Sequence, residues 1–389
     1  MSSRLQVIAL VDALGWEYIR ERQFLDDVLP YRTSLQTVLG FSSGAIPTIL
    51  TGLMPERHGH WNLFYYDPQR SPFWWLKAFN WLPNRVLDNR YGRKILKELG
   101  RRILSLGPTF ECCVSPRLLP YFNFSERRDI YAPKGIENAP SLFDELEREG
   151  RSYRVYTYHQ CSDAEILRRA RRDIAESEAT LFFLYLCEVD GFLHMRCKEP
   201  EAIDQKLQWY DEQLREVFGV ARKRDPEASL MVCSDHGMTP VTQHADLEGE
   251  MAKLGLRMPQ DYLAVYDSTM ARFWFFNDVG RERVTAVMQS LPCGHVLSRQ
   301  ELDKFGLHFP DDRYGELIFL LNPGWMVAES DFNGKGWFPE GMHGYHPDDS
   351  YSDAIFLSSE EPSQPLRTIA DVYYSIRAAG RESKEKVVL

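Results

Sequence analysis

Residues 6–12 of the chain read QVIALVD, a run of five apolar residues after Gln6 that leads directly into Asp12. Two later segments repeat this pattern: residues 181–186 (LFFLYL) precede Asp190, and residues 229–233 (SLMVC) precede Asp235. Short, nearly continuous apolar runs are typical of strands that are buried on both faces of a parallel sheet. The sequence therefore predicts three buried strands, each followed by an aspartate.

Helical patterns lie between these predicted strands. Residues 141–150 read as a capped helix that ends at a glycine, and residues 202–224 carry apolar side chains along one helical face. The alternation predicts an α/β fold with a doubly wound, mostly parallel central sheet and helices on both faces. Ligands of such sheets bind beyond the carboxyl ends of the strands, so we expect the three aspartates to converge at one edge.

Two segments interrupt the alternation. Residues 63–132 are rich in aromatic and basic side chains, and residues 244–330 contain further strand-like runs at 262–266 and 271–276. We interpret both segments as cap insertions over the active-site edge of a single catalytic domain that spans residues 1–389.

Composition narrows the classes of function. The chain has 389 residues, 44% of them hydrophobic, and a net charge of −10, which argues against binding of a nucleic-acid polymer. The acidic net charge is still compatible with a small anionic substrate, because a metal site supplies its own positive charge. The seven cysteines form no CxxC pair, so we expect reduced, buried thiols and no thiolate zinc site. The N-terminal apolar run is too short for a signal peptide or a membrane-spanning helix, which predicts a cytoplasmic protein.

The chemistry is carried by aspartates and histidines at fixed spacings. Asp190 and His194 lie four residues apart after one predicted strand, and Asp235 and His236 are adjacent after another. His343 lies between glycines late in the chain. Together with Asp12 these residues offer three carboxylates and three imidazoles, a mixed ligand set that suits zinc, or manganese in a more open site. Each signal alone is weak, since single aspartates often cap helices. The inference depends on their joint order.

That order resembles the alkaline phosphatase superfamily, and most closely its nucleotide pyrophosphatase/phosphodiesterase branch. The matching segments are SDHGM at 234–238, HGY at 343–345 and TGLMPERHG at 51–59, which follows the branch's TG-x-x-P-E-x-HG pattern. The resemblance runs from Asp12 to Tyr345 and implies two divalent metal ions about 4 Å apart that share the substrate phosphate. It assigns one ion to Asp190, His194 and His343. The other ion is assigned to Asp12, Asp235, His236 and the nucleophile.

The nucleophile of the superfamily lies nine residues before the threonine of the TG pair. Counting back from Thr51 gives Ser42, with Ser43 as the alternative. A helix over residues 45–53 would point its positive end at the oxyanion, and a metal-bound serine would be deprotonated near neutral pH. Taken by themselves, both serines could simply cap that helix.

The chain also departs from the family pattern. The phosphodiesterase branch usually has a threonine followed by Phe-Pro-Asn, whose asparagine contacts a phosphate oxygen. Here Ala45 occupies the asparagine position and the proline comes later, at Pro47. We therefore expect another donor, Asn62 or a backbone N–H, to stabilise the transition state. The sulfatase signature is absent, because Gly44 and Ile46 stand where it requires proline and arginine.

The first insertion has a second pattern. Aromatic residues are dense from 61 to 81 and basic residues from 85 to 102. Apolar residues recur every four positions, at Leu87, Tyr91, Ile95, Leu99 and Ile103. This periodicity predicts an amphipathic helix. The favoured interpretation is a cap packed on the core with a solvated basic face. The alternative is that residues 63–105 make a peripheral contact with an anionic membrane, or grip a lipid or aryl group of the substrate.

These observations predict a two-metal phosphoester hydrolase that acts on a small substrate through a phosphoseryl intermediate. Phosphodiesters are favoured over monoesters by the resemblance to the closest branch. The alternatives are a phosphomonoesterase, or a phosphoryl transferase like the related mutases and phosphoethanolamine transferases. A non-catalytic binding protein is disfavoured because every ligand position is filled. The sequence does not indicate an oligomeric state.

Overall fold

The computed structural model describes residues 4–79, 81–82, 84–104, 106, 114–331 and 337–379. Its centre is a six-stranded sheet in the order β2-β16-β7-β1-β6-β5. The strands are β1 (Gln6–Val11), β2 (Tyr31–Leu35), β5 (Tyr153–Tyr156), β6 (Leu181–Leu186), β7 (Ser229–Cys233) and β16 (Ala354–Ser358). β1 pairs in parallel with both β6 and β7, β5 is parallel to β6, and β16 is antiparallel to its neighbours. The sheet is therefore mostly parallel, as predicted.

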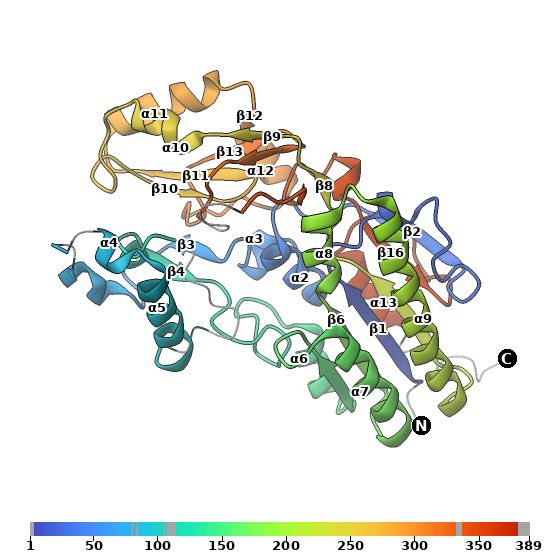
Figure 1. The fold of residues 1–389 in the computed structure, drawn as a ribbon. Helices are drawn as coiled ribbons and strands as arrows, with labels where there is room; N and C mark the ends of the chain where they lie inside the picture. The colour runs from blue at the N-terminus through green and yellow to red at the C-terminus, as the bar shows by residue number, and fades with distance from the viewer. Residues whose placement is uncertain are drawn as a thin grey trace.

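Helices cover both faces of this sheet (Figure 1). Ile8 and Leu10 of β1 belong to a hydrophobic cluster with α2 (Ser42–Thr51), α6 (Leu142–Arg148) and α13 (Asp371–Ala379). Val7, Ala9 and Val11 point to the other face. There they pack with α1 (Trp16–Ile19), α7 (Asp163–Glu176), α8 (Glu188–Arg196) and α9 (Pro200–Arg224). Because alternate side chains of a strand face opposite ways, one apolar run fills two cores, which confirms the doubly wound prediction.

The helix that carries the two candidate serines begins earlier than the sequence predicts. The backbone N–H groups of Gly44 and Ala45 both donate to the carbonyl of Phe41, so α2 begins at Ser42 rather than near Ala45. It ends at Gly52, whose φ of 69° is left-handed and therefore favours glycine. The consequence is that Ser42 occupies the first helical position.

The segment 244–330 contains a four-stranded antiparallel sheet in the order β10-β11-β13-β12. Its elements are α10 (Leu247–Ala252), β10 (Tyr262–Tyr266), β11 (Met270–Phe275), α11 (Asp278–Ser290), β12 (Gly294–Val296), α12 (Arg299–Lys304) and β13 (Leu317–Leu321). Short paired strands join it to the rest: β9 (Gln243–Ala245) with β14 (Trp325–Val327), and β8 (Thr239–Pro240) with β15 (Gly341–Met342). A separate hydrophobic cluster supports this sheet.

The described part of segment 63–132 packs beside that smaller sheet. It contains β3 (Phe64–Tyr66), η1 (Trp74–Phe79), α4 (Asn84–Leu87), α5 (Arg90–Arg102), η2 (Leu119–Tyr121) and β4 (Phe122–Phe124). Arg272 of β11 joins the two segments, because its guanidinium donates to the Asp267 carboxylate at 2.7 Å and to the Phe64 carbonyl at 2.9 Å. Figure 1 shows both segments at the end of the central sheet away from the N-terminus.

The remaining short helices are α3 (Pro55–His58) and η3 (Ser350–Ser352). Among the described residues, no helix combines the length and the apolar character needed to cross a bilayer.

Candidate active site

The three strands predicted to end in aspartates lie side by side in the sheet, in the order β7-β1-β6. Their carboxyl ends are level, because Val11 pairs with Leu186 and Leu10 with Cys233. Asp12 follows β1 directly, Asp235 follows β7, and Asp190 lies in the first turn of α8 after β6. The parallel register therefore brings the three carboxylates to one edge.

The first group of candidate metal ligands consists of Asp12, Asp235 and His236, all of which are buried. The Nε2 atom of His236 lies 3.2 Å from Asp235 Oδ2 and 3.5 Å from Asp12 Oδ1. Its Nδ1 atom lies 2.9 Å from the Gly237 carbonyl. A carbonyl only accepts hydrogen bonds, so the proton is on Nδ1 and the Nε2 lone pair is directed at the carboxylates.

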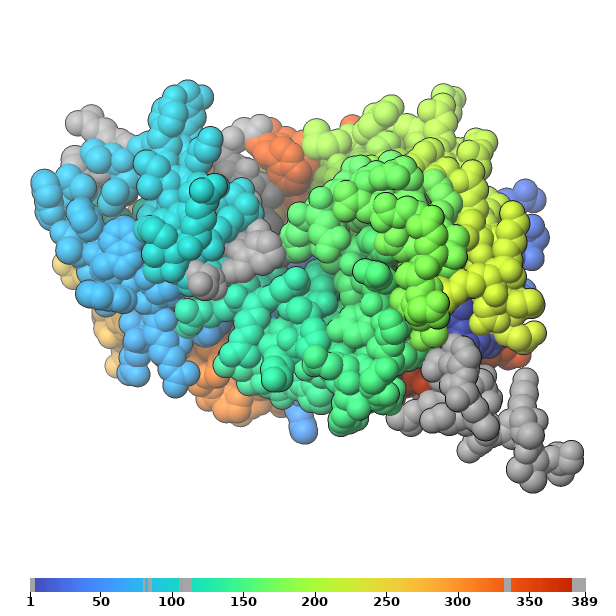
Figure 2. Space-filling view, turned by 90° about the horizontal axis from the view of Figure 1, so that it is seen from below, coloured from blue at the N-terminus to red at the C-terminus, as the bar shows by residue number. Residues whose placement is uncertain are grey.

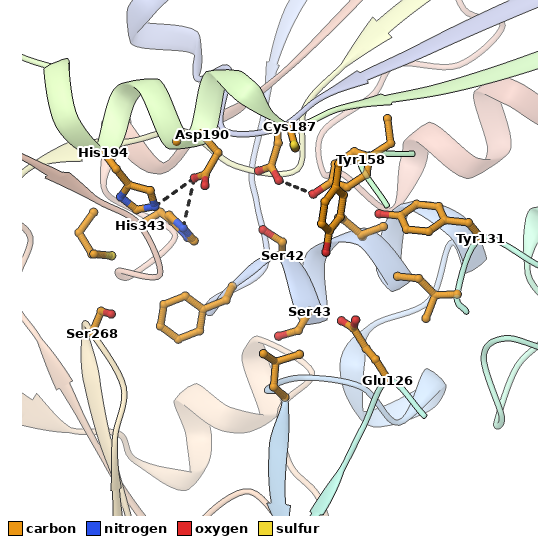
Figure 3. Close-up of a pocket in the computed structure, with 18 of the residues that line it drawn as sticks. Ser42, Ser43, Glu126, Tyr131, Tyr158, Cys187, Asp190, His194, Ser268 and His343 are labelled. Atoms are coloured by element: carbon orange, nitrogen blue, oxygen red, sulfur yellow. Dashed lines mark hydrogen bonds and ion pairs between the residues drawn. The ribbon is translucent and has the colours of Figure 1, made fainter. Parts of the chain in front are cut away.

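The second group consists of Asp190, His194 and His343. Asp190 Oδ1 lies 3.2 Å from His194 Nε2 and 3.5 Å from His343 Nε2 (Figure 3). The i,i+4 spacing on α8 places Asp190 and His194 on one helical face. His194 donates from Nδ1 to the Gly341 carbonyl at 2.8 Å, which again leaves Nε2 free for a ligand. The rings of His236 and His343 stack at 3.9 Å, so the two groups adjoin.

Buried oxygen atoms that lack a hydrogen-bond partner show whether these two groups are suited to hold metal ions. Asp12 Oδ1, Asp190 Oδ1 and Asp235 Oδ2 are buried without a hydrogen-bond partner among the described residues. They are the same oxygens that face the imidazoles. Burial, reinforced by the neighbouring Asp235 carboxylate, raises the pKa of Asp12 well above its usual range. Buried carboxylate oxygens without a partner are costly, and a divalent cation in each group would remove that cost. Nitrogen and oxygen ligands suit zinc or manganese.

The two candidate serines have different surroundings. Ser42 is half-buried, lines a cavity and places its Oγ 3.0 Å from His236 Nε2. Since that nitrogen carries no proton, the Ser42 hydroxyl is the donor. Ser43 also lines the cavity, but its hydroxyl donates to the Trp61 carbonyl at 3.0 Å. Ser42 is thus the serine whose oxygen adjoins the ligand groups.

Asn62 is buried, and its side-chain nitrogen lies 3.9 Å from the sulfur of Met270. It does not line the described cavity, although the next residue, Leu63, does. Its role in stabilising a transition state stays a prediction.

The cavity has a volume of about 590 Å³, within the usual range of small-molecule sites. Asp12, Ser42 and the group of Asp190, His194 and His343 line one part of it, and Figure 3 shows Tyr131, Tyr158 and Glu126 across from Asp190 and His194. Further lining residues come from the two predicted cap segments or lie near them: Leu63, Ile130, Ser268 and Trp337. No motif in the sequence identified these residues, because they come from loops without a characteristic spacing.

Two further side chains support the ligands and were also missed by the sequence. Tyr185 of β6 is buried and donates its hydroxyl to Asp12 Oδ2, and its ring stacks on Tyr131 at 5.3 Å. Asp163, also buried, accepts the N–H groups of Cys187 and Glu188 at 3.1 and 3.0 Å, together with the hydroxyl of Tyr210. It therefore holds the N-terminal end of the helix that carries Asp190.

The comparisons with known proteins agree with this geometry. Human ectonucleotide pyrophosphatase/phosphodiesterase 5 has the same fold with a TM-score of 0.69 at 15% sequence identity, covering 97% of this chain and 94% of its own. The murine protein matches with a TM-score of 0.68 at 16% identity, over 97% and 95% of the two chains. An inactive threonine-to-alanine variant of the murine protein, in complex with AMP, gives 0.67 at 17% identity over 97% and 95%. No curated protein sequence matches the chain.

Residues 7–346 match the family described as type I phosphodiesterase/nucleotide pyrophosphatase, and the matched stretch includes Ser42 and every predicted metal ligand. The family match agrees with the fold and with the two groups of aspartates and histidines at the sheet edge. This chain belongs to the type I phosphodiesterase/nucleotide pyrophosphatase family of phosphoric ester hydrolases, within the alkaline phosphatase superfamily.

Proposed function

We propose that this protein hydrolyses a phosphodiester or pyrophosphate bond of a small substrate, with Ser42 as the nucleophile. The observation that carries the proposal is the position of the Ser42 hydroxyl. It stands at the first position of α2, 3.0 Å from His236 Nε2 and in the cavity that Asp12, Asp190, His194 and His343 also line. The inactivity of the murine threonine-to-alanine variant supports a need for a hydroxyl group in this family.

The proposed residue roles follow from this arrangement. Asp190, His194 and His343 would hold one divalent ion, and Asp12, Asp235 and His236 would hold the other with Ser42; zinc is the expected metal and manganese the alternative. Bound ions of this kind neutralise phosphate oxygens and lower the pKa of hydroxyl groups and water. Ser42 Oγ attacks phosphorus and loses its proton, the bond to the leaving oxygen breaks, and water then cleaves the phosphoserine. The N-terminal N–H groups of α2 face the developing negative charge.

The rest of the cavity favours a diester over a monoester. Among the residues that the structure describes, those lining the cavity include no lysine or arginine, which would pair with the extra charge of a monoester dianion. The walls are instead aromatic and aliphatic, with Tyr131, Tyr158, Ile46, Leu63 and Ile130. This lining suits a substituent with a flat or apolar body. The AMP in the murine complex makes small nucleotides the first substrates to examine.

Cleavage of bis-p-nitrophenyl phosphate and of p-nitrophenyl phosphate by zinc- or manganese-loaded protein tests the proposal. We expect faster turnover of the diester, loss of activity with EDTA, and recovery when the metal is restored. A preference for the monoester would favour a phosphomonoesterase. Two bound metals without turnover of either compound would favour a phosphoryl transferase.

The choice of nucleophile is tested by the matched variants Ser42→Ala and Ser43→Ala. Loss of the attacking oxygen should lower kcat at least a thousandfold in Ser42→Ala, and acid quenching should trap no phosphoprotein. Ser43→Ala loses only a hydrogen bond to a carbonyl, so we expect a change of less than tenfold. The reverse ranking of the two variants would refute Ser42 as the nucleophile.

The predicted cytoplasmic location belongs to the same proposal. All five cysteines in the described part of the chain are free, which is compatible with a reducing compartment.

A further inference from the structure

One segment of the molecule concentrates exposed apolar side chains. The described residues include fifteen large hydrophobic side chains that are exposed, and seven of these lie within residues 74–103. We call these seven the apolar surface: Trp74, Phe79, Trp81, Val86, Tyr91, Ile95 and Ile103, from η1, α4, α5 and the residues beside them. Trp81 is 78% exposed and Ile103 is 71% exposed. Isolated exposed residues of this kind are ordinary, but a concentration of them marks an interaction site.

The orientation of α5 shows that this exposure is a property of the fold. The helix buries Leu96 and Gly100, whereas Tyr91, Ile95 and Ile103 point to solvent. Of the five stripe residues, Tyr91, Ile95 and Ile103 are thus exposed, while Leu87 and Leu99 are partly buried. A complete hydrophobic cluster lies beneath the segment, including Phe73, Leu76, Leu96, Phe122 and Trp274.

The same segment carries charge opposite to the rest of the protein. Residues 63–105 contain nine lysines and arginines and three acidic residues, a net charge of +6, while the whole chain carries −10. The remainder of the chain is therefore strongly acidic, at −16. Figure 2 shows the residues of this segment gathered at one end of the molecule, away from α7 and α9. Positive charge and exposed apolar side chains thus coincide in one place.

We propose that the apolar surface and its basic residues form a docking site for an anionic lipid bilayer. Tryptophan and tyrosine prefer the boundary between water and lipid, and an amphipathic helix with lysine and arginine beside its apolar stripe lies in that boundary. Each basic side chain near an anionic leaflet is attracted to it, and the attraction falls off within a Debye length. An anionic polymer would gain from the charge but would leave the seven apolar side chains in water. The acidic remainder of the chain would keep the rest of the protein off the bilayer.

Docking at this place would hold the active-site cavity close to the bilayer. Leu63, which lines the cavity, immediately precedes β3, and Glu126, which also lines it, lies two residues after the end of β4. β3 and β4 pair with each other at the base of the segment. The docking itself does not require the proposed catalytic chemistry, so a failure of one leaves the other standing.

Co-sedimentation of the full-length protein with vesicles tests the proposal. We compare vesicles of phosphatidylcholine alone with vesicles that also contain phosphatidylglycerol. We expect binding to the anionic vesicles at low salt, at least tenfold weaker binding to phosphatidylcholine, and release at 1 M salt, where the Debye length falls to about 3 Å. No binding to anionic vesicles at low salt would overturn the proposal.

Variants at exposed positions separate the apolar contribution to vesicle binding from the electrostatic one. The triple variant Tyr91→Ser/Ile95→Ser/Ile103→Ser should weaken binding to anionic vesicles at least tenfold, and Lys94→Glu/Arg102→Glu should do the same. The controls Val279→Ser and Tyr374→Ser remove exposed apolar side chains elsewhere and should bind like the wild type. Thermal unfolding and turnover of the soluble diester check that each variant is folded.

Two further outcomes would count against a bilayer. Unchanged vesicle binding in the triple variant would overturn the proposal. So would concentration-dependent self-association of the wild type that the triple variant abolishes, because the surface would then be an interface between copies of the chain.

Discussion

The hydrogen bond from Tyr185 to Asp12 predicts a measurable effect of Tyr185→Phe on metal binding. Burial, together with the Asp12 carboxylate, raises the pKa of Tyr185 well above its usual value, so the hydroxyl remains a donor at every accessible pH. Phenylalanine keeps the ring that stacks on Tyr131 and removes a single oxygen. Asp12 Oδ2 then loses the donor that orients it, while Oδ1 still faces His236.

The size of the effect follows from the kind of bond that is lost. A hydrogen bond to a charged group contributes about 1.5–3 kcal/mol, and loss of a partner that orients a metal ligand typically lowers metal affinity about 10–100-fold. We therefore expect the Kd for one of the two metal ions to rise by about that factor. The ion held by Asp190, His194 and His343 should bind as in the wild type.

Isothermal titration of metal-free protein with zinc or manganese measures this change directly. Thermal unfolding at fixed metal concentration provides a second measure, because a tenfold loss of affinity removes about 1.4 kcal/mol of metal-dependent stabilisation. The control is Tyr156→Phe on the neighbouring strand β5, which removes a 2.6 Å hydrogen bond to Asp173 of α7. Wild-type metal affinity at both sites in Tyr185→Phe, or an equal loss in the control, would refute the reasoning.

Three further changes test the packing around the candidate ligands and beside the smaller sheet, where Asp331 accepts a hydrogen bond from Tyr266. Asp163→Asn should destabilise the fold by about 2–3 kcal/mol, because one carboxylate oxygen is replaced by a donor that faces the N–H groups of Cys187 and Glu188. Chemical denaturation measures the free energy of unfolding, and a change below about 0.5 kcal/mol would contradict this prediction. Gly237→Ala places a Cβ 2.1 Å from the Tyr351 carbonyl oxygen and should lower the free energy of unfolding by about 2–3 kcal/mol. Gly191→Ala is the control, because its Cβ would have no neighbouring atom within 4 Å, and it should be nearly neutral. Equal unfolding energies for the two variants would exclude the clash. Burial raises the pKa of Asp331 to about 7, so its contribution to stability is full below the unfolded pKa of about 4 and is lost as pH rises through 7. Asp331→Asn should therefore unfold like the wild type in acid and be about 4 kcal/mol more stable at alkaline pH, and parallel pH–stability curves would refute this assignment.

Much of the clustering of the candidate ligands was predictable because its signals are local in the sequence. Asp12, Asp190 and Asp235 each follow an apolar run long enough for one buried strand. His194 and His236 stand at short, fixed distances from those aspartates. Parallel strands in one sheet end at the same edge, so local patterns were sufficient to bring these five side chains together.

Other features depend on which surfaces meet after folding. The start of α2 at Ser42 depends on hydrogen bonds to Phe41, and helix ends are weakly marked in the sequence. The outward orientation of Tyr91 and Ile95 was left open by the sequence, because a periodic apolar stripe does not state whether it faces a core or an external partner. The residues that support the ligands, such as Tyr185 and Asp163, carry no motif.

The sequence by itself thus determined the class of fold, the three strands that precede the aspartates, and the family. Apolar periodicity and short motifs encode these properties within a few residues of each other. Only the tertiary structure decided the far wall of the cavity, the pairing of Tyr185 with Asp12 and the exposure of the apolar surface. These depend on contacts between residues such as Arg272 and Phe64, 208 positions apart, and local patterns contain no information about which distant partner a side chain will meet.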